Sequence, residues 1–199
     1  MKVKGDASVK FKESNTVQSL NPGTPLSDQD KITTGENGFV ALMYIDDKTV
    51  VKILGNSILD ILGKRSGATI NKSINIEYGR VAAAVTTQKG KEFRVSTPTS
   101  VASVKGTTLA IESEPSTGDS FTLLEGLIEV TNVVTGESTE VQEGETALST
   151  NDGSLEVNQT TQMDLDGFEE ASLEVSNQEI RFEIEDDNGE LKEIIIKFQ

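Results

Sequence analysis

The sequence contains no cysteine, no histidine and no tryptophan among its 199 residues. Without cysteine it can form neither a disulfide nor a thiolate metal site, and without histidine it lacks the side chain that most readily transfers protons near neutral pH. Aromatic residues make up only 5% of the chain, so its core must be built mainly from Val, Ile and Leu. These absences argue against an enzyme with an active site of a usual kind.

Positive charge is also scarce, with 18 Lys and Arg against 33 Asp and Glu and a net charge of −15. A nucleic-acid partner needs a basic surface, and an anionic membrane would repel this chain, so neither partner is predicted. No apolar run is long enough to span a bilayer, so no membrane insertion is predicted. The first residues, MKVKGD, do not continue into the apolar segment of a signal peptide.

What the sequence does contain is a series of short alternating segments separated by turn residues about every ten positions, which is typical of an all-β sandwich, barrel or short β-helix. VAAAV, residues 81–85, is too short for an independent helix and is interpreted as a strand. The expected strands of the main series are 3–11, 38–45, 49–54, 57–62, 73–78, 79–86, 92–97, 100–104, 107–113, 121–124, 127–133, 138–141 and 146–149.

The last part of the chain differs from this series. Residues 158–162 are polar and linker-like, and two alternating segments, 180–184 and 191–198, flank an Asn-Gly turn that favours a hairpin. The predicted organisation is therefore a β domain over 1–157, followed by a linker and a C-terminal β-hairpin over 158–199. A lone hairpin is marginal in water, so its apolar residues are expected to contact a partner or another copy. These candidate interaction residues are Ile180, Phe182, Ile184, Ile194, Ile196 and Phe198.

The order of several short motifs resembles the FecR domain family over about residues 3–157. The most specific part is FRVSTP at 93–98 followed by VASVKGT at 101–107. The other matching elements are LSDQDKITTG at 26–35, DDKTV at 46–50, GRV at 79–81, FTLLEG at 121–126 and EGE at 143–145.

The resemblance implies an all-β, extracytoplasmic and non-enzymatic module, either a short β-helix or a two-layered β-sandwich. Regulators of this family relay signals from outer-membrane receptors to sigma factors. A periplasmic, extracellular or cell-surface location is therefore expected, with a native leader or anchor missing from the sequence as given.

The residues of the T-P and V-K-G-T elements also have a direct physical interpretation. Pro98 cannot donate a ladder hydrogen bond and is expected at a strand end, and Gly106 suits a bend or a close backbone approach. No acidic residue occurs from 94 to 111, which indicates an interior segment. Lys105 is the exception, and we expect it either to face a carboxylate partner or to extend its ammonium into solvent.

Two chemical alternatives follow from the acidic residues. Calcium is the candidate metal because it prefers clustered carboxylate oxygens, although turn chemistry explains the same aspartates equally well. The candidate ligands are Asp28, Asp30, Asp46 and Asp47. A glycosidase would need two carboxylates at working distance, and the candidates for such a pair are Glu77, Glu112, Glu125 and Glu129. No aromatic platform for a sugar accompanies them, so no enzyme and no cofactor other than calcium is predicted.

Two functions remain open at this point. The first is a signalling module of the bacterial envelope that binds a protein partner. The alternative is a structural subunit of a cell-surface or extracellular filament, assembled by β-strand addition. The second hypothesis depends on segments 3–11 and 193–199 having unpaired edges.

Overall fold

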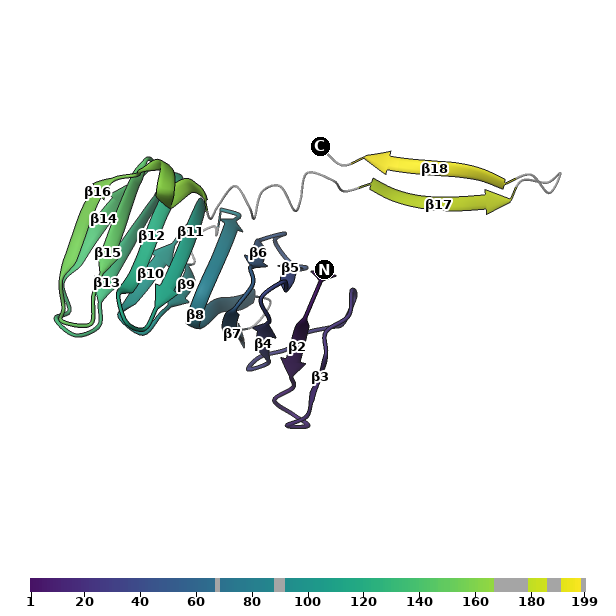
Figure 1. Ribbon diagram of the computed structural model, residues 1–199, viewed down its shortest axis with the longest axis horizontal. Helices are drawn as coiled ribbons and strands as arrows, with labels where there is room; N and C mark the ends of the chain where they lie inside the picture. Colours follow the sequence, from purple (N-terminus) through teal and green to yellow (C-terminus); the bar gives the residue numbers. More distant parts are fainter. Residues whose placement is uncertain (67–68, 88–91, 167–178, 186–190, 198–199) are drawn as a thin grey trace.

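The computed structural model describes residues 1–66, 69–87, 92–166, 179–185 and 191–197, and it shows a two-layered β-sandwich (Figure 1). The neighbouring strands are antiparallel except for one parallel pair, β8 with β9. Sheet 1 contains, in spatial order, β1 (Lys2–Lys4), β5 (Phe39–Met43), β6 (Val50–Ile53), the second half of β8 (Thr69–Val85), β11 (Thr107–Glu114), β12 (Gly118–Glu125), β15 (Glu145–Ser149) and β16 (Leu155–Gln159).

The second layer, sheet 2, shares β8 with sheet 1. It contains, in order, β3 (Val17–Ser19), β2 (Ala7–Lys10), β4 (Lys31–Thr34), β7 (Ser57–Ser66), the first half of β8, β9 (Phe93–Ser96), β10 (Ser100–Val104), β13 (Leu127–Asn132) and β14 (Ser138–Gln142). The all-β prediction is confirmed, and of the two expected forms the two-layered sandwich describes it.

The core lies between the two sheets because each strand directs every second side chain inward. The burial pattern of β10 and β11 alternates along both strands, so the segment without acidic residues is indeed interior. A single apolar cluster joins the two layers. Its members from sheet 1 include Leu109, Ile111 and Phe121, and those from sheet 2 include Ile74, Val95 and Ile128.

The long strand β8 connects the two layers. Gly79 lies in it with φ +106°, and a Cβ built there would be 2.5 Å from the Cα of Ser57. The pairing with the neighbouring strand β7 is irregular just before Gly79, because its register shifts between Ile58 and Leu59. Up to Tyr78 the strand pairs with β7, and from Gly79 onward it pairs with β11 in the other sheet. The two strands expected over 73–78 and 79–86 are therefore one continuous strand, because Gly79 bends the chain without a turn.

The N-terminal segment shows the reverse. The single strand expected over 3–11 is divided into β1 and β2, which belong to different sheets. Gly5, with φ +60°, lies between them, and a Cβ there would be 1.9 Å from the carbonyl oxygen of Asn37. Strand β2 is paired on both sides, with β3 and β4, so only β1 of this segment is an edge. Strands β3, β4 and β16 were not predicted, because they are short and rich in polar residues.

The predicted C-terminal hairpin is present as β17 (Glu179–Glu185) paired with β18 (Leu191–Lys197). Its register places Ile180 opposite Ile196 and Phe182 opposite Ile194. Phe198 lies outside the described residues. In the part of the chain that is described, no helix has the length and hydrophobicity needed to cross a membrane.

Candidate interaction surface

The predicted calcium ligands Asp46 and Asp47 lie in the turn between β5 and β6, where both contact the ammonium of Lys72. The Lys72 Nζ is 2.9 Å from Asp46 Oδ1 and also contacts Asp47 Oδ2, and the Lys72 side chain is only 2% exposed. The same ammonium lies 5.1 Å from the centre of the Tyr44 ring. A cation of the chain itself therefore occupies the position next to these two carboxylates.

Asp28 and Asp30 form a turn before β4. Asp30 is 3% exposed, and its two oxygens accept hydrogen bonds from the backbone N–H groups of Lys12 at 3.0 Å and Ser27 at 2.8 Å. Asp28 accepts a hydrogen bond from the backbone N–H of Gly63 at 2.8 Å. Across the described ranges, no cluster of three or more acidic side chains is arranged to hold a metal ion. The four aspartates therefore have structural contacts, and calcium binding stays a prediction.

Lys105 lies at the turn between β10 and β11, with its side chain 72% exposed. Its Nζ is 3.7 Å from Glu92 Oε1, and Arg94 approaches the other oxygen of the same carboxylate at 3.9 Å. Exposed pairs of this length contribute little stability. Gly106 beside it has φ +142° and would place a Cβ 3.0 Å from the Cα of Thr87, which explains the glycine as a close approach.

The T-P element forms a buried polar network at the corner between β9 and β10. Thr99 donates to Asp119 on β12 through its backbone N–H at 2.8 Å and through its hydroxyl group. Nearby, Asn132 donates to Ser149 Oγ at 2.8 Å and accepts from the backbone N–H of Val134. Because Asp119 is 3% exposed and Asn132 fully buried, this network is a structural link between strands.

The carboxylates considered for glycoside hydrolysis are not brought together. Glu77 contacts Lys31 on the outer face of sheet 2, and Lys31 also lies 3.5 Å from Asp60. Glu112 is on β11 of sheet 1 opposite Ser120, Glu125 is at the far end of β12 opposite Thr108, and Glu129 is on β13 of sheet 2. The structure therefore provides no pair among these residues for that chemistry.

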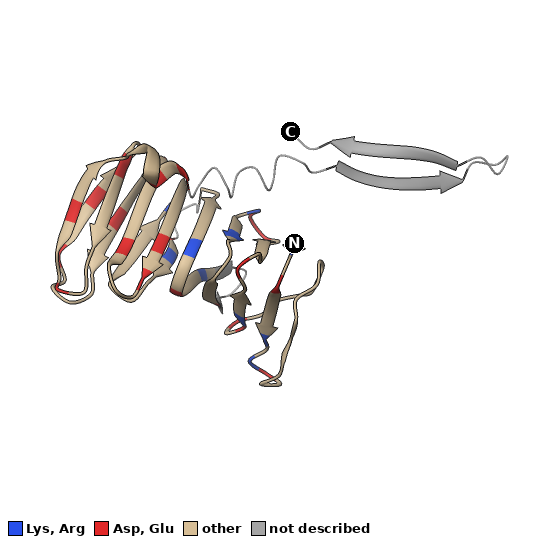
Figure 2. Ribbon diagram, in the orientation of Figure 1, with Lys and Arg blue, Asp and Glu red and all other residues tan. Residues whose placement is uncertain are grey.

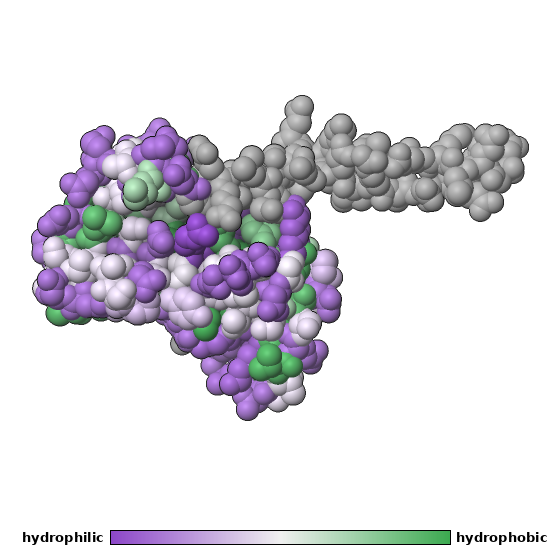
Figure 3. Space-filling view, viewed as in Figure 1, coloured by the Kyte–Doolittle hydropathy of each residue, from purple (hydrophilic) through white to green (hydrophobic). Residues whose placement is uncertain are grey.

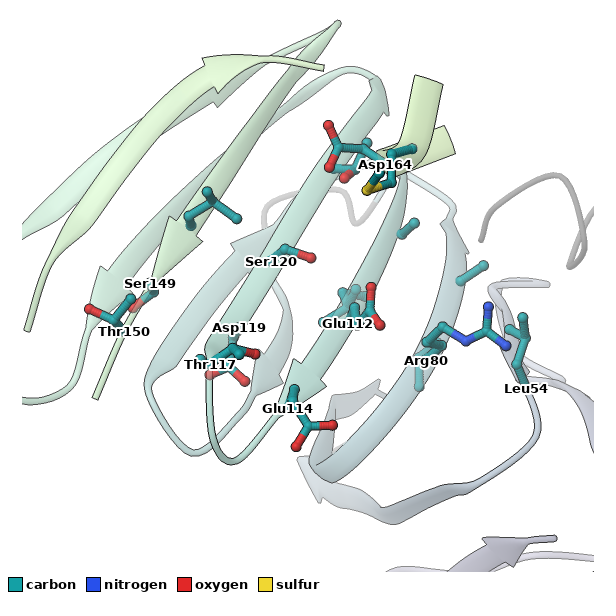
Figure 4. A pocket seen from close by; sticks show the side chains of 18 residues that line it. Leu54, Arg80, Glu112, Glu114, Thr117, Asp119, Ser120, Ser149, Thr150 and Asp164 are labelled. Carbon is teal, nitrogen blue, oxygen red and sulfur yellow. The ribbon is translucent and has the colours of Figure 1, made fainter. Parts of the chain in front are cut away.

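A groove on the outer face of sheet 1, which the sequence reasoning missed, has a volume of about 440 Å³ (Figure 4). Its floor is formed by short side chains of β8, β11 and β12, including Ala82, Ala110 and Ser120. Ala82 points away from the main core, and yet it is only 4% exposed, because it packs against Leu54 on the outer face of the sheet. The sheet surface is therefore recessed at this point.

One wall of the groove is made by Arg80 and Leu54, and the other by Leu148 and the short helix 162–166. That helix is capped reciprocally, since the Thr161 N–H donates to Asp164 Oδ2 at 2.7 Å and the Asp164 N–H donates to Thr161 Oγ1 at 3.4 Å. Met163 in this helix is 83% exposed and Leu148 43% exposed. Apolar side chains are thus presented beside the recessed floor.

The groove is strongly acidic. Glu112 and Glu114 project from β11 and are exposed, while Asp164 lines the opposite wall. Between Gly106 and Asp166 the sequence contains thirteen acidic residues and no Lys or Arg. Figure 2 shows Asp and Glu without Lys or Arg on β11 to β16, whereas residues of both signs occur among the N-terminal strands. The lack of Lys and Arg over this range can be read directly from the sequence, so the sequence alone could have indicated an acidic surface here.

The surface around these strands is mainly hydrophilic in the view of Figure 3, with separate small hydrophobic areas. The fold and this surface define the class of the protein: an all-β sandwich domain with an acidic surface groove. A family model described as FecR protein matches residues 30–129, which is half of the chain. The chain belongs to the FecR family. The resemblance based on the T-P and V-K-G-T elements is thereby confirmed.

Two solved structures assigned as an anti-sigma factor from Parabacteroides distasonis share the fold. One has a TM-score of 0.58 at 14% identity and the other 0.56 at 15% identity, and each alignment covers 68% of this chain. The aligned part spans 62% of each of those chains, so the present chain matches less than two thirds of their length. No curated protein matches the sequence.

Proposed function

We propose that this chain is a non-enzymatic signalling module of the bacterial cell envelope that acts by binding a protein partner in the periplasm or at the cell surface. Its membership of the FecR family is the observation that carries this proposal. The fold shared with structures assigned as an anti-sigma factor is consistent with a regulatory role.

The geometry favours binding over chemistry. The buried ionisable groups Lys72, Asp30 and Asp119 are engaged in contacts that hold strands and turns together. The recessed outer face of sheet 1, by contrast, combines short floor residues, exposed apolar side chains and the exposed carboxylates of Glu112 and Glu114. Such a combination suits contact with another polypeptide, because close backbone approach, apolar contact and charge are offered together.

Site-specific photocross-linking tests the proposed function. A photoreactive amino acid would replace Glu112 on sheet 1 in one variant and Glu129 on sheet 2 in another, both exposed positions, in cells of the source organism. A discrete adduct with an envelope protein, identified by mass spectrometry at either position, is the expected result. The absence of any adduct from both faces, with the protein correctly folded and expressed, would contradict a protein-binding role.

A further inference from the structure

We infer that the groove on the outer face of sheet 1 binds an extended segment of the partner that carries basic residues at every second position. This inference rests on the proposed function, since it specifies the partner's chemistry and the face that recognises it. It is argued from the recess, from the spacing of the carboxylates and from the charge around them.

The floor of the groove permits close approach by a backbone. Ala82, Ala110 and Thr122 lie opposite one another across β8, β11 and β12, Ser120 is two residues from Thr122 on β12, and all four side chains are short. The higher walls are Arg80 on one side and Leu148 with Met163 on the other.

The carboxylates along β11 have the period of an extended chain. Glu112 and Glu114 are two residues apart on one strand, so they point to the same side and are separated by about 6.7 Å. A segment that runs alongside β11 repeats its side chains on one face with the same spacing. Two basic residues separated by one position would therefore face Glu112 and Glu114 in register, and the intervening residue would point away.

The register within sheet 1 also shows where apolar contact is available. Glu112 lies opposite Arg80 on β8 and opposite Ser120 on β12, and Ser120 in turn lies opposite Leu148 on β15. Arg80 is thus the basic end of this row, and the apolar side chain of Leu148 is the other end. Arg80 lies directly opposite Glu112 on the neighbouring strand. Glu114 is two residues further along β11, where its opposite residue on β12 is Gly118.

The charge of the surrounding surface favours a basic ligand at longer range. The thirteen acidic residues without any Lys or Arg between Gly106 and Asp166 create a negative field over β11 to β16. Such a field raises the association rate of a cationic ligand and rejects an acidic one. The groove is the recessed part of this acidic surface, so a cationic ligand that the charge attracts can also make close contacts there.

A peptide of alternating Lys and Val, eight residues long and labelled with fluorescein, is a suitable probe. Its binding to the full chain would be measured by fluorescence anisotropy at about 50 mM salt, where surface charges are incompletely screened. We expect saturable binding that weakens about tenfold in the double variant Glu112→Gln/Glu114→Gln. The equivalent Glu and Val peptide should not bind.

The matched control is Glu129→Gln/Glu140→Gln on sheet 2, where the two residues are exposed and directly opposite each other. It removes the same charge from the other face, and we expect the dissociation constant of the Lys and Val peptide to change less than about twofold. Equal weakening in both double variants would mean unspecific attraction and would overturn the inference, as would a lack of binding by the unmodified chain. Cross-linked adducts together with either of these results would leave the proposed function standing and remove only the groove assignment.

Discussion

Lys72 is a buried cation whose charge partners lie far from it in the sequence. It occupies a core-facing position of β8, two residues before Ile74, and is buried. Burying an ammonium is costly unless opposite charges accompany it, and Asp46 and Asp47 provide them from the turn between β5 and β6. This contact attaches a turn of sheet 1 to a strand of sheet 2. Asp46 and Asp47, two of the four candidate calcium ligands, therefore have a cationic partner within the chain.

Tyr44, in the same cluster, gives a prediction about pH. Burial, followed by the nearby Asp47 and Asp46 carboxylates, raises the pKa of its hydroxyl above the ordinary value of 10.0. The pKa of Lys31 is also raised above its ordinary value of 10.5, chiefly by its hydrogen bond to Glu77. Both folded-state pKa values exceed the unfolded ones. The contribution of each group to the free energy of unfolding is therefore complete below about pH 10 and is lost as the pH rises further.

The variant Tyr44→Phe separates these contributions. The Tyr44 hydroxyl is buried and has no hydrogen-bond partner among the described residues, so its removal should leave the free energy of unfolding at pH 7 unchanged or slightly higher. Between about pH 10 and 11 the variant should lose stability less steeply than the unmodified chain. Urea denaturation across this range measures both effects. Parallel decline of the two proteins would show that Tyr44 does not titrate as proposed.

At the scale of elements, β8 determines how the sandwich is assembled. It contributes its first half to sheet 2 and its second half to sheet 1, and Gly79 marks the change. The Arg80 N–H donates to Ser57 Oγ at 3.0 Å at this crossing, which holds β7 close to the bend. A side chain at position 79 would occupy the space that Ser57 fills. Close packing of two backbones thus fixes the point where the layers meet.

The variant Gly79→Ala tests this role against Gly136→Ala. Both glycines have positive φ, +106° and +73°, but a Cβ at Gly136 would meet nothing within 4 Å. We expect Gly136→Ala to lower the free energy of unfolding by about 1 kcal/mol, from backbone strain alone. Gly79→Ala should lower it by about 3 kcal/mol, because contact with Ser57 is added to the strain. Equal losses in chemical denaturation would show that the crossing tolerates a side chain.

At the scale of the whole molecule, two features bear on association. The edges of the sandwich in the described residues are β1 and β16 in sheet 1 and β3 and β14 in sheet 2. Edge β1 carries Lys2 and Lys4, and lysine on an edge strand discourages pairing with another sheet. The acidic C-terminal half would also repel the same half of another copy. Both features favour a separate module over a polymer.

Light scattering over a hundredfold range of concentration tests this expectation. We expect a constant molar mass near 21.4 kDa, with and without calcium, for the full chain. Growth into large species would instead favour the filament hypothesis, and a chain lacking residues 180–199 would then show whether the hairpin β17–β18 is responsible. Growth that requires calcium would return the aspartates of the turns to consideration as ligands.

The sequence by itself determined the fold class and the family. Alternation of apolar and polar residues is a local property, and it identified the strands from Phe93 to Ser149 closely, including the corner at Pro98 and the close approach at Gly106. The absence of histidine and cysteine likewise excluded whole classes of chemistry without reference to structure. These conclusions required only neighbouring residues or the composition.

Only the tertiary structure decided which distant residues meet. A bend without a turn is invisible in a pattern of alternation, so β8 was divided in two and its neighbour in the other sheet could not be inferred. The pairing of Lys72 with Asp46, and the row that joins Arg80 through Glu112 and Ser120 to Leu148, depend on the register of strands far apart in the chain. Register is set by the packing of the whole core, and a local pattern gives each strand an inner and an outer face but not its neighbours.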